Sequence, residues 1–385
     1  MMFSASAQVI IVAPILPEIS EALGIGEALQ GLLITSYTVT LGIVALIIGP
    51  ISDKVGRRRI LLIGCGSMSA ALALHGMVDT YVSFVAVRAL AGAAGGALSG
   101  GAVAFVGDFF PYERRGWANG WVMSGMAVGQ ILGIPVGKIL ADQFGFRWPF
   151  LMFAVTMAIA TLLVWLFLPQ PDVRRDEGRL GIRSSIVKYR LLMATDSVRA
   201  VSIVYLLMFF SLGLFVIYLP TWLEMVVGVS GTDIASLFFV GGLANVVSSP
   251  IAGRLSDRVG RKPLIIASCV GLGIVMVVTT YAIQGIWTAY IFFATAMVMF
   301  ALRISPLQSL MTALVPDERR GMLMSLAIAV GQVGMGLGSA LAGVAYTSYG
   351  YISNTMMATA SIVVMAFMVH YFLPEPTAET AAAST

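Results

Sequence analysis

Two arginines stand within long apolar stretches of this 385-residue chain, at positions 88 and 303. A guanidinium stays charged and carries five N–H donors, so it can hold an anion or fix main-chain oxygens. An ionisable side chain in such a setting is costly and is therefore a candidate functional residue. We expect Arg303 to act in substrate binding or coupling, with a structural role as the alternative. For Arg88 two roles remain open. One is structural, with hydrogen bonds to the main chain or to the first helix, and the other is functional.

Other polar or aromatic residues near the middle of apolar stretches could line a cavity, although each is also compatible with simple packing. They are Gln8, Tyr37, Gln130, Tyr205, Phe209, Asn245 and Gln332. The 19 carboxylates lie in loops, at helix ends or in tails. The histidines, His75 and His370, are far apart, and nothing resembles a nucleotide-binding P-loop. We therefore expect no enzyme, no metal and no cofactor.

The elements that position these residues are expected to be membrane-spanning helices. Hydrophobic residues make up 58% of the chain and charged residues 11%, against about 25% charged in soluble domains. A helix needs roughly 20 apolar residues to cross a bilayer. Twelve stretches qualify, so we predict an all-α membrane protein. Their spans are 3–22, 29–51, 59–78, 82–107, 116–139, 147–168, 199–222, 233–254, 263–283, 287–313, 321–345 and 350–373.

The basic residues indicate the orientation of these helices. With the N-terminus inside, 19 of the 23 lysines and arginines fall in cytoplasmic loops and their flanks, and only Lys138 and Arg147 fall outside. Both termini are therefore expected in the cytoplasm. The positive charge is a topology signal, and we expect no nucleic-acid partner.

The chain contains an internal repeat. GPISDKVGRRRIL at 49–61 matches GRLSDRVGRKPLI at 253–265, and FPYERRG at 110–116 matches VPDERRG at 315–321. The offsets, 204 and 205, predict two copies of one six-helix bundle. The expected parts are an N-terminal bundle (1–168), a cytoplasmic linker (169–198), a C-terminal bundle (199–373) and a cytoplasmic tail (374–385). Parallel repeats of this kind bind substrate near the membrane midplane, between the halves.

The repeated stretch also predicts a gate on the cytoplasmic face. Asp53 lies at the C-terminal end of its helix, where a carboxylate is disfavoured by the helix dipole. It would be stabilised by a cation or by the N-terminus of another helix. We expect it to face the helix that begins near Arg320, and Asp257 to face the one that begins near Gly116. The alternative is a pair of turns whose cations only set topology. The gating candidates are Gly49, Asp53, Gly56, Arg57, Asp108, Glu113, Arg114, Gly253, Asp257, Gly260, Arg261, Glu318 and Arg319.

Several motifs in this order resemble those of the major facilitator superfamily, and the resemblance covers the whole chain. The stretches 49–61 and 253–265 are similar to its loop signature. RALAGAAGGA from Arg88 is similar to its helix-4 signature. PILP at 14–17 resembles the drug-efflux branches, and GMAVGQILGIPVG at 125–137 resembles an antiporter signature, with Gly-Ile-Pro where Gly-Pro is usual. Many drug/proton antiporters carry an acid in the first helix, where this chain has Gln8.

The antiporter motif places small residues on one helix face. Gly125, Gly129, Gly133 and Gly137 recur every fourth residue, and Pro135 is expected to bend the helix. The resemblance implies a flexible, leak-tight seam between the halves, while packing alone is the alternative. Gly334 and Gly338 begin a similar face in the second half.

The resemblance implies a monomeric secondary transporter of a bacterial inner membrane, working by alternating access. It is most similar to the 12-helix drug/proton antiporters and the sugar-efflux branch. The expected function is proton-coupled efflux of drugs, small amphiphiles or sugars. One alternative is an organic-anion carrier that uses Arg303 and Arg88. An alternative of another class is a membrane sensor that transports nothing.

Overall fold

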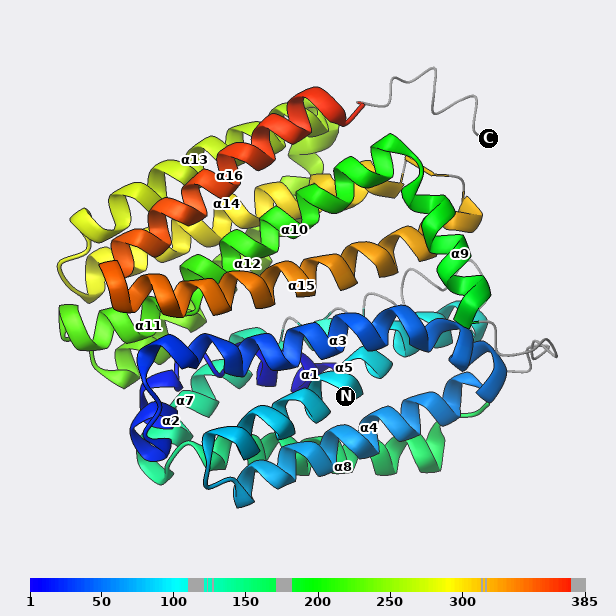
Figure 1. Cartoon of the computed structure of the whole chain (residues 1–385), viewed down its shortest axis with the longest axis horizontal. Helices are drawn as coiled ribbons and strands as arrows, with labels where there is room; N and C mark the ends of the chain where they lie inside the picture. Colours follow the sequence, from blue (N-terminus) through cyan, green and yellow to red (C-terminus); the bar gives the residue numbers. More distant parts are fainter. Residues whose placement is uncertain are drawn as a thin grey trace. The chain divides into compact units, whose positions relative to one another are not determined.

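The computed structural model describes residues 1–109, 121–122, 124–126, 128–170, 182–312, 314–315 and 317–374. Every regular element in these ranges is a helix (Figure 1). Eleven of the described helical segments are long and apolar enough to cross a membrane. The prediction of an all-α membrane protein is thus confirmed, whereas the count of twelve spans is not.

The first predicted span, 3–22, is divided. It forms α1 (Met2–Ile10) and α2 (Leu16–Leu23), both shorter than a membrane crossing. Pro14 lies between the two helices and Pro17 lies in the first turn of α2. Proline lacks an N–H and crowds the preceding turn, so one continuous helix through this stretch is disfavoured.

The chain forms two compact units, of which unit 1 comprises residues 1–186 together with 230–239. In unit 1, α3 packs along α5, and α4 packs against α5 and α8. The other helices that lie wholly in this unit are α3 (Glu27–Val55), α4 (Arg57–Leu74), η1 (His75–Met77), α5 (Tyr81–Phe109), η2 (Gly129–Gly133), α7 (Ile134–Phe144) and α8 (Arg147–Phe167).

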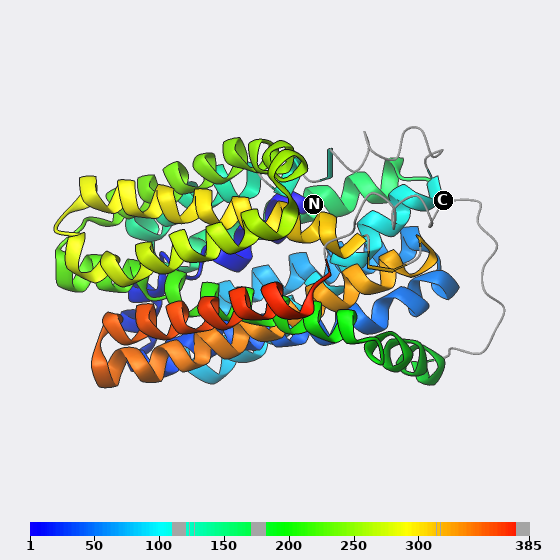
Figure 2. The ribbon, with the colours of Figure 1, turned by 90° about the horizontal axis from the view of Figure 1, so that it is seen from above.

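Unit 2 comprises residues 187–229 and 240–385. Here α10 runs beside α15 and α16, and α13 pairs with α14 in a hairpin, coloured yellow-green to yellow in Figure 2. The helices are α10 (Asp196–Val216), α11 (Leu219–Trp222), η3 (Leu223–Val227), α12 (Gly231–Val259), α13 (Arg261–Ala282), α14 (Ile286–Thr312), α15 (Asp317–Tyr349) and α16 (Tyr351–Phe372).

Two helices begin in residues assigned to unit 1 and end in residues assigned to unit 2. The predicted linker contains α9 (Ile182–Met193), whose first residues belong to unit 1. The first turns of α12 also belong to unit 1, while its remainder belongs to unit 2.

The repeated stretch forms the same turn twice. Gly56, between α3 and α4, has φ 102° and ψ 139°, and Gly260, between α12 and α13, has φ 99° and ψ 148°. Each glycine N–H donates to the carbonyl four residues earlier, Ser52 or Ser256, at 3.0 Å. Positive φ is costly for residues with a Cβ, so glycine is required at both positions. The internal repeat is therefore present in the backbone as well as in the sequence.

Candidate functional site

Arg88, on α5, lies at the centre of a buried polar site in unit 1 and is fully buried. Its Nη1 donates to Gln8 Oε1 at 2.9 Å and to the Gln8 main-chain oxygen at 3.1 Å. Its Nε donates to the main-chain oxygen of Leu33 at 3.3 Å. The guanidinium carbon also lies 4.5 Å from the centre of the Tyr37 ring, a cation–π distance. One side chain thus connects α1, α3 and α5.

Glycines on α5 allow α3 to approach this site. A Cβ on Gly92 would lie 2.2 Å from the main-chain oxygen of Tyr37, and one on Gly95 would lie 2.4 Å from the Tyr37 hydroxyl oxygen. Both distances are far below van der Waals contact, so larger residues would push the helices apart. Gly92 lies one turn beyond Arg88, and the close approach brings Leu33 and Tyr37 within reach of the guanidinium.

The Arg88 charge is balanced by dipoles in the described part of the chain, because its hydrogen bonds go to an amide and to main-chain oxygens. Within the described ranges its Nη2 is buried and has no hydrogen-bond partner. Buried donors of this kind are costly and call for an acceptor. The site can therefore accept an oxygen-bearing group or a water molecule.

Arg303, on α14 of unit 2, is also buried, with 1% of its surface exposed. Its Nη1 lies 3.9 Å from the Met365 sulfur of α16, its guanidinium carbon lies 5.5 Å from the Phe300 ring centre, and it interacts with the Cys269 thiol of α13. In the described ranges its Nε has no hydrogen-bond partner. Among the residues that the structure describes, Arg303 therefore lies beside soft and aromatic groups rather than a carboxylate.

The other predicted cavity residues are scattered over separate contacts. The Tyr205 ring packs 6.0 Å from the Phe209 ring, and Asn245 Nδ2 donates to the Met297 oxygen at 3.5 Å. Gln332, on α15, is half-buried. The Gln130 side chain lies outside the described part. In the described part, direct contacts therefore join Gln8, Tyr37 and Arg88 into one group and pair Tyr205 with Phe209.

Much of the predicted gate falls outside what the structure describes. Among its described members, Arg261 Nη1 donates to the Ser309 oxygen at 3.2 Å, Arg57 begins α4 and Gly253 lies within α12. The roles assigned to these residues and to the two turn glycines remain predictions. Positions whose side chains lie outside the described residues are Gly49, Asp53, Asp108, Glu113, Arg114, Asp257, Glu318 and Arg319.

The helix-5 glycines meet α1 of their own unit. A Cβ on Gly129 would lie 2.3 Å from the Phe3 oxygen, and one on Gly133 would lie 2.6 Å from the Ala7 Cβ. Gly125 and Gly137 likewise face α1 and the residue that follows it, meeting Met2 and Ile11. This placement fits the packing alternative, and the seam between the halves stays a prediction. Pro135 lies just after η2, a π-helical turn that interrupts the helix.

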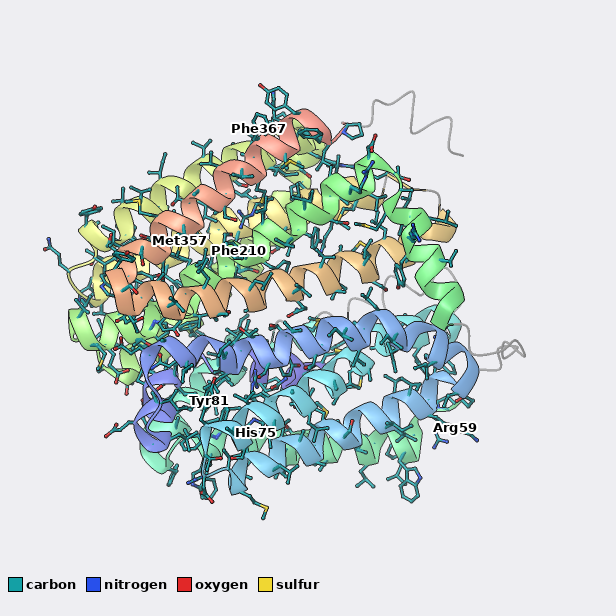
Figure 3. The ribbon with its side chains drawn as sticks, viewed as in Figure 1. Arg59, His75, Tyr81, Phe210, Met357 and Phe367 are labelled. Carbon is teal, nitrogen blue, oxygen red and sulfur yellow. The ribbon has the colours of Figure 1, made fainter. Side chains whose placement is uncertain are left out.

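The second half repeats this glycine packing. A Cβ on Gly334 would lie 2.4 Å from the Leu206 oxygen, and one on Gly338 would lie 2.3 Å from the oxygen of Phe210, which is labelled in Figure 3. Gly129 and Gly334 are 205 residues apart, the offset of the second sequence repeat. Helices α10 and α15 therefore pack as α1 and η2 do.

His75, also labelled in Figure 3, directly follows α4 and is buried within unit 1. Its ring stacks on Phe150 at 4.2 Å and meets the edge of Phe84 at 5.2 Å, and its Nδ1 lies 2.8 Å from the Ala71 oxygen. The aromatic contacts indicate a packing role for His75.

Sequence reasoning missed a buried ionic cluster. Lys138, on α7, is fully buried, and its Nζ contacts Glu18 Oε1 of α2 and lies 2.9 Å from Asp142 Oδ1. The spacing of Lys138 and Asp142, four residues on one helix, was a signal for half of the cluster. Glu18 is 120 residues away from Lys138, and no local pattern connects the two.

Comparisons with known proteins agree with this architecture. The family model of the Major Facilitator Superfamily matches residues 1–247 and 201–385. MFS-type transporter YwfA of Bacillus subtilis (strain 168) is 27% identical over 375 residues, 96% of this chain and 89% of that protein. Multidrug resistance protein MdtG of Enterobacter lignolyticus (strain SCF1) is 27% identical over 300 residues, 74% of this chain and 69% of that protein.

Two solved structures share the fold. A D-xylose–proton symporter matches with a TM-score of 0.79 and 18% identity, over 97% of this chain and 96% of that one. The human organic anion transporter MFSD10 (TETRAN) matches with a TM-score of 0.73 and 16% identity, over 96% of each chain. At these identities the likeness concerns the fold alone.

Proposed function

This chain belongs to the Major Facilitator Superfamily, and from that premise we propose that it exports small amphiphilic molecules by proton-coupled alternating access. The relatives named for multidrug resistance support the export of drug-like molecules. Within that class we propose neutral or acceptor-bearing substrates in preference to lipophilic cations.

The observation that carries this substrate class is the Arg88 site. Its charge is buried and is met by Gln8 and a main-chain oxygen, and one buried donor group, Nη2, has no partner in the described ranges. A cation brought to this place would be repelled at low dielectric, where like charges interact strongly. A carbonyl, ether or hydroxyl oxygen would satisfy the open donor.

The test is transport by the purified protein in liposomes carrying an imposed proton gradient. We expect the gradient to drive accumulation of neutral amphiphiles, a protonophore to abolish it, and Arg88→Met to reduce it at least about tenfold, as loss of charge-assisted bonds implies. Arg199→Lys is the matched control, because Arg199 is 56% exposed. Preferred transport of lipophilic cations would contradict the substrate class, and absence of any flux would favour the sensor.

A second candidate function is transport of organic anions, and the observation that favours it is Arg303. This arginine is buried, interacts with a thioether, an aromatic ring and a thiol, and has an open Nε donor in the described ranges. A carboxylate or sulfonate would supply the missing countercharge. Unchanged anion transport after Arg303→Gln would eliminate this candidate, whereas selective loss of anion transport would replace the first one.

A further inference from the structure

We infer that Glu18, Lys138 and Asp142 form a proton-binding site of this transporter. Its role in coupling rests on the proposed function, whereas the binding of a proton does not. The site lies in unit 1, where the first turn of α2 meets α7. It is distinct from the Arg88 site, with which it shares no residue.

The geometry places one buried cation between two carboxylates. Lys138 is fully buried, and its Nζ contacts Glu18 Oε1 and lies 2.9 Å from Asp142 Oδ1. The side chains of Glu18 and Asp142 keep 22% and 27% of their surface exposed. Water can therefore reach the carboxylates, while the buried ammonium would be left as an uncompensated charge if neither carboxylate beside it were ionised.

The charges do not cancel, because two carboxylates share a single ammonium. Two acids this close together resist being ionised at the same time. Glu18 lies in α2, outside the candidate membrane spans. Burial and the neighbouring Asp142 raise the pKa of Glu18 to about 7, although Lys138 opposes the shift. The proton comes from water at this end of the helices and returns to it.

Other charged groups on the surrounding elements do not replace these partners. The described turns of α1 and η2 carry no charged side chain. Arg147 of α8 pairs with Asp79, and Asp233 of α12 accepts a hydrogen bond from Ser230. Glu21 and Glu27 complete the charged residues of α2 and of the first turn of α3. Within the described ranges, the charged groups that act on Glu18 are Lys138 and Asp142.

The site also contacts the start of α12. A Cβ on Gly231, the first residue of α12, would lie 2.5 Å from Asp142 Oδ2. The N-terminus of a helix carries partial positive charge and favours an ionised carboxylate. A proton on Glu18 weakens the contact with Lys138, and where the Glu18 carboxyl shares that proton with Asp142 by a hydrogen bond, the contact with the start of α12 weakens as well. In this way proton binding can alter how α12 is held.

The first experiment measures proton binding without any substrate. Thermal unfolding of the purified protein in detergent is followed from pH 5 to pH 9 for the wild type, Glu18→Gln and Asp142→Asn. A folded-state pKa above the unfolded value means that the folded protein keeps the proton longer, so stability falls as pH rises toward the folded value. We expect the wild-type Tm to fall by roughly 3 °C relative to Glu18→Gln as the pH rises from 5, with most of the fall complete by about pH 7 and little change above it.

Two further variants sharpen the test. Lys138→Met removes the ammonium and leaves two adjacent carboxylates, so the fall in Tm should continue to higher pH than in the wild type. Asp79→Asn is the matched control, because Asp79 also forms an ion pair, with Arg147, but its side chain is 83% exposed. The pH profile of this variant should match that of the wild type. Identical profiles in the wild type, Glu18→Gln and Asp142→Asn would overturn the site.

Transport assays separate this inference from the proposed function. If the titration is present but no amphiphile is moved, the proton site stands and the proposed efflux fails. If efflux remains proton-driven in both Glu18→Gln and Asp142→Asn and their pH profiles are unchanged, the efflux stands and the proton site fails. Loss of both the titration and the proton-driven efflux in these variants supports the site and its coupling role.

Discussion

Arg88 Nη1 donates to both oxygens of Gln8, the side-chain Oε1 at 2.9 Å and the main-chain oxygen at 3.1 Å. Because Gln8 is a neutral amide, it orients the guanidinium without cancelling its charge. An acid at the same position would convert a polar site into an ion pair.

Gln8→Glu should therefore change which molecules are transported. The new carboxylate would neutralise Arg88, so the preference for acceptor-bearing substrates over cations should fall by about tenfold, the effect of roughly 1.4 kcal/mol. Competition between a neutral and a cationic fluorescent substrate in liposomes measures this ratio. Gln332→Glu is the matched control, because it makes the same substitution on α15 of unit 2, whereas Arg88 belongs to unit 1. An unchanged ratio in Gln8→Glu would show that position 8 does not set the charge preference.

Arg88→Lys should destabilise unit 1 although it keeps the charge. Lysine cannot reach Gln8 and Leu33 with a planar fork of donors, so we expect a loss of about 2 kcal/mol in the free energy of unfolding. Thermal or denaturant unfolding in detergent measures the loss. Arg199→Lys, on the exposed surface, should stay within about 0.5 kcal/mol of the wild type. Equal stabilities for the two variants would argue against a bridging role for Arg88.

Alanine at either repeated glycine should disturb helix packing. The added Cβ would lie 2.3 Å from the Phe3 oxygen in Gly129→Ala and 2.4 Å from the Leu206 oxygen in Gly334→Ala. Backbone atoms cannot rotate away, so each should cost about 1–3 kcal/mol as overpacking. Gly285→Ala is the control, since a Cβ there has open space. Equal free energies of unfolding for all three variants would show that the close approach of the helices does not require glycine at Gly129 and Gly334.

The turn glycines should respond as a matched pair. Gly56 and Gly260 differ by only a few degrees in φ, so alanine at either position should cost a similar amount, about 1 kcal/mol or more. Unfolding measurements on the two single variants and the double variant test this. Strongly unequal costs would indicate that one turn can relax to another conformation.

The helices could be predicted from the sequence because twenty consecutive apolar residues leave few alternatives in a bilayer. The division of the first span was harder to predict, since prolines also occur inside other helices of this chain, at Pro250 and Pro306. Whether a proline interrupts a helix depends on what neighbouring helices supply to the freed main-chain oxygens.

The candidate site could be predicted only in part, for a related reason. Arg88 stood out because a charge is rare in an apolar stretch, and both its main-chain and first-helix partners were among the expected alternatives. Glu18 did not stand out, because an acid near a helix start is ordinary. Its contact with Lys138 depends on how α2 packs on α7, which no spacing within either helix encodes.

The paired contacts of Gly129 with Phe3 and Gly334 with Leu206 bear on the ancestry of the chain. After a gene duplicates, a side chain in one copy can change when its neighbour changes to fit it. A glycine that packs against a main-chain oxygen cannot be replaced in this way. Every residue has that oxygen, so no substitution of the neighbour makes room for a Cβ. After duplication, we therefore expect the internal repeat to persist longest at pairs such as Gly129 and Gly334, where a glycine packs against main chain.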